Sequence, residues 1–241
     1  MSLLLVIIFI FVGQIIGATI GLLGKPRSSI LYGSLAFAAA MMISLSLFEL
    51  VPEALKMSNK PIVMLSFFAG ILIMLAVDKA LPHINPEFMH SETPSVKKSI
   101  FMLVIGIALH NIPEGLAIGV GFQNNQKSGL MIALGIALQD IPENIATIIP
   151  LFNFTKSRWK SFLITTSTVL FEFIGFLVSY IAFKGSSDII LAFSLAAAAG
   201  FMTYISVEEL MPEAFEFKSK KPAWVGFVAG SLVVLLLLSV F

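Results

Sequence analysis

Eight apolar runs, each about as long as a lipid bilayer is thick, constrain this chain more than any other feature. A membrane-spanning helix needs about 20 mostly apolar residues, and within lipid only helices or closed barrels satisfy the backbone hydrogen bonds. The runs cover residues 3–23, 30–54, 61–81, 99–122, 128–151, 160–183, 188–214 and 222–241. We therefore predict an all-α integral membrane protein with eight transmembrane helices and a single domain over residues 1–241.

Composition agrees with that class. Hydrophobic residues make up 58% of the chain and charged residues 12%, and the mean hydropathy is +0.98, whereas soluble domains average about 45–50% apolar and about 25% charged residues. The net charge of +1 gives no reason to expect nucleic acid as a partner, and the lack of cysteine excludes disulfides and thiolate ligands. The first run lacks a charged leader and a small-residue cleavage site, so we interpret it as a spanning helix and not as a signal peptide.

The loop charges predict the orientation. Lysine and arginine gather in cytoplasmic loops, and here they gather after the odd-numbered runs, as in Lys156, Arg158 and Lys160. We therefore expect a multi-pass protein of the cell (inner) membrane with both termini extracellular or periplasmic. The one long loop, residues 82–98, holds His83 and His90, which we interpret as solvated residues, with metal sensing as the alternative.

A motif written twice points to function. Residues 105–118 read IGIALHNIPEGLAI and residues 134–147 read LGIALQDIPENIAT, so that one polar set matches another at an offset of 29. The matched pairs are His110 with Gln139, Asn111 with Asp140, Pro113 with Pro142 and Glu114 with Glu143. Carboxylates inside a membrane are costly and mark functional sites. Because residues i and i+4 share a helix face, we predict that His110 and Glu114 point the same way, as do Gln139 and Glu143.

A longer repeat divides the chain. Residues 49–54 read ELVPEA and residues 209–214 read ELMPEA, at an offset of 160, and Gln14 resembles Glu172 in its surroundings at an offset of 158. The first three helices thus resemble the last three in the opposite direction across the membrane. This pattern predicts a 3+2+3 inverted repeat, which is typical of alternating-access transporters with a substrate site near the midplane.

The polar set favours divalent metal ions. If ionised, Glu114, Asp140, Glu143 and Glu172 supply four negative charges, which two divalent ions would neutralise. One imidazole, several carboxylates and two amides suit zinc, cadmium, iron or manganese better than copper(I). We expect the metal as a transported substrate, with no resident cofactor. The alternative for single residues is a packing or hydrogen-bonding role, in particular for His110 and Glu172.

These motifs resemble those of the ZIP (Zrt/Irt-like) metal transporters, and the closest branch looks like the GufA-type prokaryotic members. The resemblance implies a binuclear centre, with a first site at His110, Glu114, Gln139 and Glu143. It implies a second site at Asn111, Glu114, Asp140, Glu143 and Glu172, in which the two glutamates bridge. It also implies a transport bundle of helices 1, 4, 5 and 6, a dimerising scaffold of helices 2, 3, 7 and 8, and elevator-type alternating access. Many members have histidine where this chain has Gln139.

Two other functions fit parts of the pattern. An intramembrane metal-dependent hydrolase would also bury metal ligands, but it needs a general base and an open coordination position, and the chain has no HExxH motif. A metal exporter would differ only in the direction of net flux. The acidic residues Glu49 and Glu53 at one helix end, and Glu208, Glu209 and Glu213 at another, are interpreted as clusters near the entrance and exit or as ordinary helix-end carboxylates.

Overall fold

The computed structural model describes the chain except for residues 1, 25–27, 81–95 and 217, so the predicted role of His83 and His90 lies outside the described residues. Within the described part, eight helices are long and apolar enough to span a membrane, as predicted. Their segments are α1 (Ser2–Leu23), α2 (Ser28–Leu45), η1 (Ser46–Leu50), α3 (Val51–Met57), α4 (Lys60–Ala80), α6 (Val96–Asn124), α7 (Gln126–Thr155), α8 (Arg158–Ser167), α9 (Val169–Ala182), α10 (Asp188–Ile205), η2 (Ser206–Leu210), α11 (Met211–Ala214) and α12 (Lys221–Val240).

The turns between the helices follow from local chemistry. Helix α7 begins after Asn125, whose side chain accepts a bond from the Lys127 backbone N–H. It ends at Thr155 and is followed by Lys156, which adopts a left-handed conformation with φ 52°. Ser157 then caps α8 by accepting from the Lys160 backbone N–H. Side-chain caps of this kind satisfy the backbone donors that a helix start leaves free, so these antiparallel neighbours need only short connections.

Two spans contain a π-helical turn at equivalent places. Segments η1 and η2 cover residues 46–50 and 206–210, which are 160 residues apart, and each is followed by a helix with proline in its first turn. Proline lacks a backbone N–H, and single π-helical turns are often found at functional sites. The apolar runs 30–54 and 188–214 predict continuous helices, and the structure adds one π-helical turn to each.

The sixth span contains a one-residue interruption. The sequence predicted one run over residues 160–183, and the structure has one span over Arg158–Ala182. Within that span, α8 ends at Ser167 and α9 begins at Val169. The hydroxyl of Thr168 bonds the carbonyl of Thr165 at 2.7 Å, and the N–H of Phe171 bonds the carbonyl of Thr168 at 3.0 Å. These shorter-range bonds replace the regular helical ladder at Thr168, whose carbonyl accepts a hydrogen bond from Asn111 of α6.

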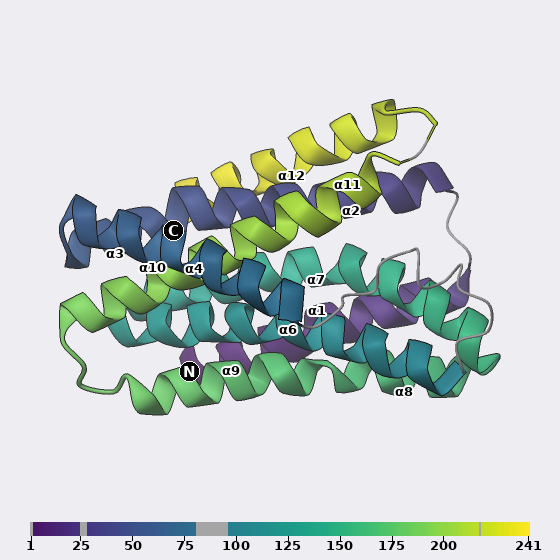
Figure 1. Cartoon of the computed structure of the whole chain (residues 1–241), viewed down its shortest axis with the longest axis horizontal. Helices are drawn as coiled ribbons and strands as arrows, with labels where there is room; N and C mark the ends of the chain where they lie inside the picture. Colours follow the sequence, from purple (N-terminus) through teal and green to yellow (C-terminus); the bar gives the residue numbers. More distant parts are fainter. Residues whose placement is uncertain (1, 25–27, 81–95, 217) are drawn as a thin grey trace.

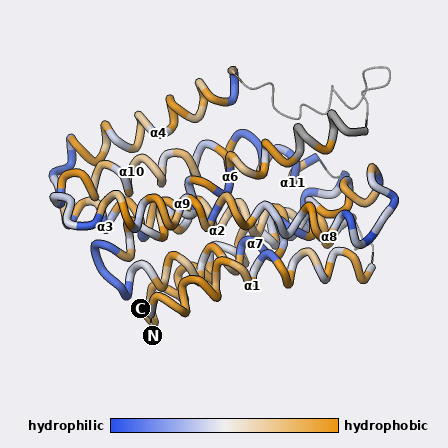
Figure 2. The backbone as a smooth tube through the Cα atoms, turned by 90° about the horizontal axis from the view of Figure 1, so that it is seen from below, coloured by the Kyte–Doolittle hydropathy of each residue, from blue (hydrophilic) through white to orange (hydrophobic). Residues whose placement is uncertain are grey.

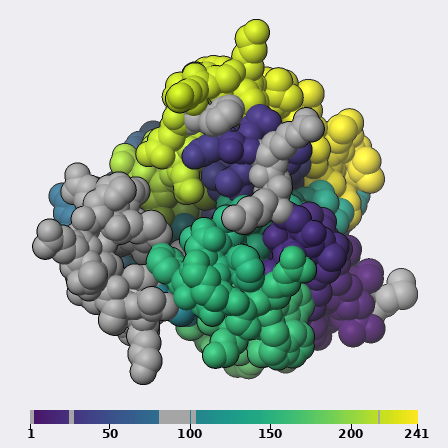
Figure 3. All heavy atoms as spheres, turned by 90° about the vertical axis from the view of Figure 1, so that its right-hand side faces the viewer, coloured from purple at the N-terminus to yellow at the C-terminus, as the bar shows by residue number. Residues whose placement is uncertain are grey.

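The spans pack in two groups, seen side by side in Figure 1 and end-on in Figure 3. Helix α1 packs on α7 and α6 packs on α9, with α6 also against α7; we call α1, α6, α7, α8 and α9 the bundle. Helix α2 packs on α12 and α4 packs on α10; we call α2, η1, α3, α4, α10, η2, α11 and α12 the scaffold. The two groups meet where α2 contacts α7 and α10 contacts α6.

The surface is apolar along the helices. Figure 2 shows hydrophobic residues over most of the length of α1 and α4, with hydrophilic residues at the helix ends and within α6 and α7. Large side chains such as Leu65, Leu72 and Leu236 are more than half exposed. Apolar side chains facing outward and polar side chains facing inward are the pattern expected in lipid.

Candidate metal centre

Two long helices carry the doubled motif into the interior. Helix α6 presents the HNIPEG segment and α7 presents the QDIPEN segment, and both helices continue through their prolines, Pro113 and Pro142. All seven polar residues of the two segments are buried, with exposed fractions of 8% or less. They are Asn144 and the six predicted ligands His110, Asn111, Glu114, Gln139, Asp140 and Glu143. The spacing within each motif therefore places both sets on the faces where the two helices meet.

Three carboxylates form the centre of the site. Glu114, Asp140 and Glu143 each offer an oxygen, and these oxygens all lie within 4.8 Å of one another. Their exposed fractions are 0%, 2% and 7%. Like charges this close, and removed from water, repel strongly unless protons or cations neutralise them. The arrangement is suited to a divalent cation.

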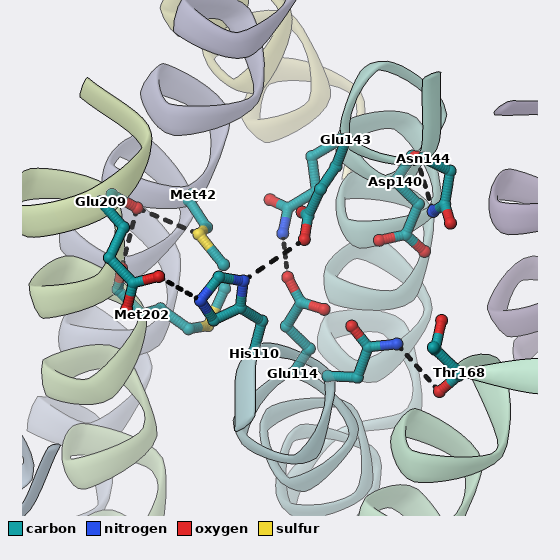
Figure 4. Close-up of polar contacts among 12 residues, drawn as sticks. Met42, His110, Glu114, Asp140, Glu143, Asn144, Thr168, Met202 and Glu209 are labelled. Atoms are coloured by element: carbon teal, nitrogen blue, oxygen red, sulfur yellow. Dashed lines mark hydrogen bonds and ion pairs between the residues drawn. The ribbon is translucent and has the colours of Figure 1, made fainter. Parts of the chain in front are cut away.

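His110 joins the bundle to the scaffold. Its Nδ1 lies 3.6 Å from Oε1 of Glu143, and its Nε2 lies 2.9 Å from Oε2 of Glu209. Figure 4 shows the imidazole between these two carboxylates, with Met42 and Met202 of the scaffold nearby. Glu209 belongs to the π-helical turn η2. A single histidine side chain thus connects the central carboxylates to a residue of the other helix group.

Gln139 ties the two motif helices together. Its Nε2 donates a hydrogen bond to Oε1 of Glu114, and its side chain is fully buried. Its own Oε1 has no hydrogen-bond partner in the structure. Amide oxygens ligate cations, whereas amide nitrogens do not, so the atom left without a partner is the one that could bind a metal.

A second polar group lies around Thr168, which Figure 4 shows on the side of the site away from Glu209. Nδ2 of Asn111 donates to the Thr168 carbonyl at 3.0 Å. Glu172 is fully buried and its Oε2 accepts from Nε2 of Gln14 at 2.9 Å. The Thr168 hydroxyl lies 3.3 Å from Oε1 of the same Gln14. The second group therefore adjoins the first through Asn111, which follows His110 on α6.

Five buried oxygens of these residues lack a donor. They are Glu114 Oε2, Gln139 Oε1, Asp140 Oδ2, Glu143 Oε2 and Glu172 Oε1. Buried acceptors are normally paired, because an unpaired one loses its hydration without replacement. Every one of these oxygens belongs to a residue that the sequence analysis proposed as a metal ligand. Bound metal ions would supply the positive charge that these oxygens lack.

The structure brings all seven predicted ligands into one buried region, whereas their ligand roles stay predictions. Sequence reasoning missed the contact of Glu209 with His110, because it placed Glu209 in a cluster at the helix end with Glu208 and Glu213. Both of these other residues are exposed. It also missed the direct bond between Gln14 and Glu172. The repeat offered a signal for both residues, since Glu209 matches Glu49 and Gln14 matches Glu172.

The second predicted acidic cluster ties the two groups together at the other end of the scaffold. Oε1 of Glu49 accepts from the hydroxyl of Ser128 at 2.7 Å, and Oε1 of Glu53 accepts from Nδ2 of Asn124 at 2.6 Å. Lys56 also contacts Glu53, with 2.5 Å between Nζ and Oε2. Ser128 and Asn124 belong to the bundle, so these acids take part in specific contacts between the two groups.

Comparison with known proteins gives a consistent result. A family model described as ZIP Zinc transporter matches residues 89–238. The zinc transporter ZupT of Enterobacter sp. (strain 638) is 37% identical over 228 residues, which cover 91% of this chain and 89% of that protein. The proteins of the same name from Shigella dysenteriae serotype 1 (strain Sd197) and Escherichia coli (strain K12 / DH10B) are each 36% identical over the same shares. The matched region includes all the candidate ligands.

Proposed function

The chain belongs to the ZIP family of zinc transporters, and from this we propose that it carries zinc and related divalent ions into the cytoplasm through a binuclear site between α6 and α7. Membership makes the protein a multi-pass membrane transporter of divalent metal and not an enzyme, which sets aside the hydrolase alternative. The observation that carries the site is the cluster of Glu114, Asp140 and Glu143, whose oxygens lie within 4.8 Å of one another.

The donors divide between two ions. His110, Gln139 and the two glutamates of the motifs would hold the first ion, and Asn111, Asp140, Glu172 and the same two glutamates would hold the second. Two carboxylates support this division, because in both Glu114 and Glu172 one oxygen accepts from an amide and the other oxygen lacks a donor. Imidazole, carboxylate and amide ligands without sulfur suit Zn²⁺, Cd²⁺, Fe²⁺ and Mn²⁺. A site without thiolates also fits a substrate that must leave again.

Reciprocal contacts within the bundle support an inverted repeat. A Cβ on Gly17 would come within 3.0 Å of Cα of Ile141. A Cβ on Gly175 would meet the carbonyl of Ile112 and lie 3.4 Å from Cα of Gly115. Gly175 follows Gly17 by 158 residues and Ile141 follows Ile112 by 29, the two offsets of the sequence repeat. The α1–α7 and α6–α9 contacts are thus equivalent residue by residue.

Contacts between helices within the scaffold are also related by the sequence repeat. A Cβ on Gly70 would lie 3.0 Å from the carbonyl carbon of Ala197, and one on Gly230 would lie 3.1 Å from that of Phe37. Gly230 follows Gly70, and Ala197 follows Phe37, by 160 residues. Each group is therefore nearly symmetric in itself, which supports a division into a transport bundle and a scaffold, each moving as one body.

Contacts between the two groups break that symmetry, and this supports an elevator-type motion. The counterpart of the Glu209–His110 contact would be one between Glu49 and Gln139, but Glu49 instead bonds Ser128. Ser128 and Gln139 are eleven residues apart on α7, which at about 1.5 Å per residue corresponds to a slide of roughly 16 Å. We propose that the bundle slides by this distance and exchanges Ser128 for Gln139 at Glu49.

The predicted orientation gives this motion a direction. With both termini outside, Glu49 and Glu53 tie the bundle at the outer end of the scaffold, and Glu209 lies toward the inner end. The structure then corresponds to a state in which the outer end is closed. We further propose that the chain acts as a homodimer through its scaffold, whose helix α12 exposes Trp224, Val225 and Val228.

Uptake into proteoliposomes tests the proposed function. Purified protein in sealed vesicles should import Zn²⁺, and external Cd²⁺, Mn²⁺ and Fe²⁺ should compete according to their affinity for the site. Empty vesicles control for leak. Protein inserted in the opposite orientation, distinguished by protease access to a terminal tag, separates import from export. Vesicles that accumulate no divalent metal under any gradient would contradict the proposal.

A further inference from the structure

Gln14 is a buried polar residue of the first span that the proposed binuclear site does not use as a ligand. It is 1% exposed and lies in α1, which consists otherwise almost entirely of apolar and small residues. Burying an amide within a membrane protein is costly unless both of its ends are paired. The pairs that Gln14 makes therefore indicate what it does.

Both ends of the Gln14 amide have a partner. Nε2 donates to Oε2 of Glu172 at 2.9 Å, and Oε1 accepts from the Thr168 hydroxyl at 3.3 Å. The same hydroxyl also donates to the Thr165 carbonyl at 2.7 Å, so its one proton makes a bifurcated bond to the two oxygens. The amide is thus oriented, with its donor toward the carboxylate. One oxygen of Glu172 is held, while Oε1 has no partner.

The same network reaches a second candidate ligand. The Thr168 carbonyl, between α8 and α9, accepts from Nδ2 of Asn111 at 3.0 Å. This bond holds the amide nitrogen, so the amide oxygen is the atom of Asn111 that could ligate a cation. Three candidate ligands serve only the second ion, namely Asn111, Asp140 and Glu172. Two of them, Asn111 and Glu172, are therefore oriented by one polar network that includes Gln14 and Thr168.

We propose that Gln14 is a positioning residue for the second metal ion. It holds Oε2 of Glu172 so that Oε1 faces the ion, and it does not ligate the ion itself. The neutral charge of Gln14 is part of this role. Gln14 is the repeat counterpart of Glu172, and a carboxylate at this position would add a fifth negative charge to a site that holds two divalent ions. The inference rests on the proposed binuclear site. It explains why the repeat is chemically unequal at this position.

Zinc titration of the purified full-length chain by calorimetry tests the proposal. Gln14→Met keeps the size of the side chain and removes the donor. We expect the dissociation constant of the second ion to rise by about 10- to 100-fold, as is usual when a group that orients a metal ligand is lost, and that of the first ion to stay unchanged. Gln14→Asn keeps the amide on a shorter side chain and should also weaken the second ion alone.

A double-mutant cycle separates positioning from general packing. The single variant Glu172→Gln and the double variant Gln14→Met with Glu172→Gln should have the same raised dissociation constant for the second ion, because Gln14 acts through Glu172. Losses that add in the double variant, or a Gln14→Met protein with two unchanged dissociation constants, would overturn the positioning role. A parent protein that binds a single zinc ion would overturn the binuclear site as well. An unchanged dissociation constant for the first ion shows, in each variant, that the site has folded.

Discussion

Shared carboxylates are the most sensitive residues of the proposed site. Glu114 and Glu143 come from matching positions of the two motifs, and both lie in the cluster of oxygens. Glu114→Ala or Glu143→Ala should abolish zinc uptake in proteoliposomes, because each change removes a ligand and a charge from both ions. Ser44→Ala, a buried polar change in α2, serves as a control at matched expression. Parental uptake by either glutamate variant would exclude this site.

We predict that Gln139 sets the metal preference of the proposed first site. Gln139→His would replace an amide with an imidazole, which is a better zinc ligand. We expect several-fold tighter zinc binding, a narrower range of metals and slower release, seen as a lower KM and a lower maximal rate of zinc uptake. Gln139→Ala is the control for losing the bond to Glu114. Identical relative uptake of Zn²⁺ and Mn²⁺ in the histidine variant and the parent would mean that Gln139 does not touch the metal.

Substitution of Glu172 should distinguish the two proposed ions. It is fully buried and lies outside the doubled motif. Glu172→Gln removes one charge but leaves His110, Glu114, Gln139 and Glu143 for the first ion. The variant should bind one metal ion per chain tightly, in place of two, and transport should fall without being lost. Native mass spectrometry of variant and parent counts the ions. Two tightly held ions in the variant would assign Glu172 to packing.

At the scale of elements, glycines set how closely helices approach. A Cβ at Gly17 would lie 2.9 Å from Cβ of Asn144 and would meet the backbone of Ile141. Gly17→Val should therefore separate α1 from α7 and destabilise the bundle by about 1–3 kcal/mol, the usual cost of overpacking. Thermal unfolding in detergent measures this loss. Gly24→Val, where an added Cβ meets nothing within 4 Å, is the matched control, and equal melting temperatures for the two variants would contradict the close contact.

The paired π-helical turns are another property of elements. They lie at corresponding positions of the second and seventh spans, and they carry Glu49 and Glu209. Both glutamates contact the bundle, through Ser128 and His110. A π-helical turn changes the direction in which the side chains after it point, since it adds a residue to one turn of the helix. Each half of the scaffold thus has one irregular turn at its contact with the bundle.

At the scale of the whole molecule, the proposed slide is open to disulfide trapping. The natural chain has no cysteine, so an introduced pair of cysteines forms disulfides without competition from native thiols. Glu49→Cys with Ser128→Cys should cross-link in the observed arrangement, since the native side chains bond at 2.7 Å. Glu49→Cys with Gln139→Cys should cross-link only after the bundle has moved by roughly 16 Å.

Gel mobility under a mild oxidant measures both cross-links, and the three single-cysteine variants are the controls. The first pair should also stop zinc uptake until a reductant is added. A rigid molecule would form the first cross-link and not the second, and that result would contradict the elevator motion.

The sequence alone determined the number of spans, the all-α class and the set of polar residues that gather in the interior, because hydropathy and the i, i+4 spacing are local properties of a helix. The resemblance of the two motifs likewise led to the family. Only the tertiary structure decided that His110 contacts Glu209, that Gln14 holds Glu172, and that Glu49 bonds Ser128. Such contacts depend on how far one helix group is displaced along the other. Apolar helix faces allow several such registers, so long-range pairing cannot be obtained from the periodicity of any single segment.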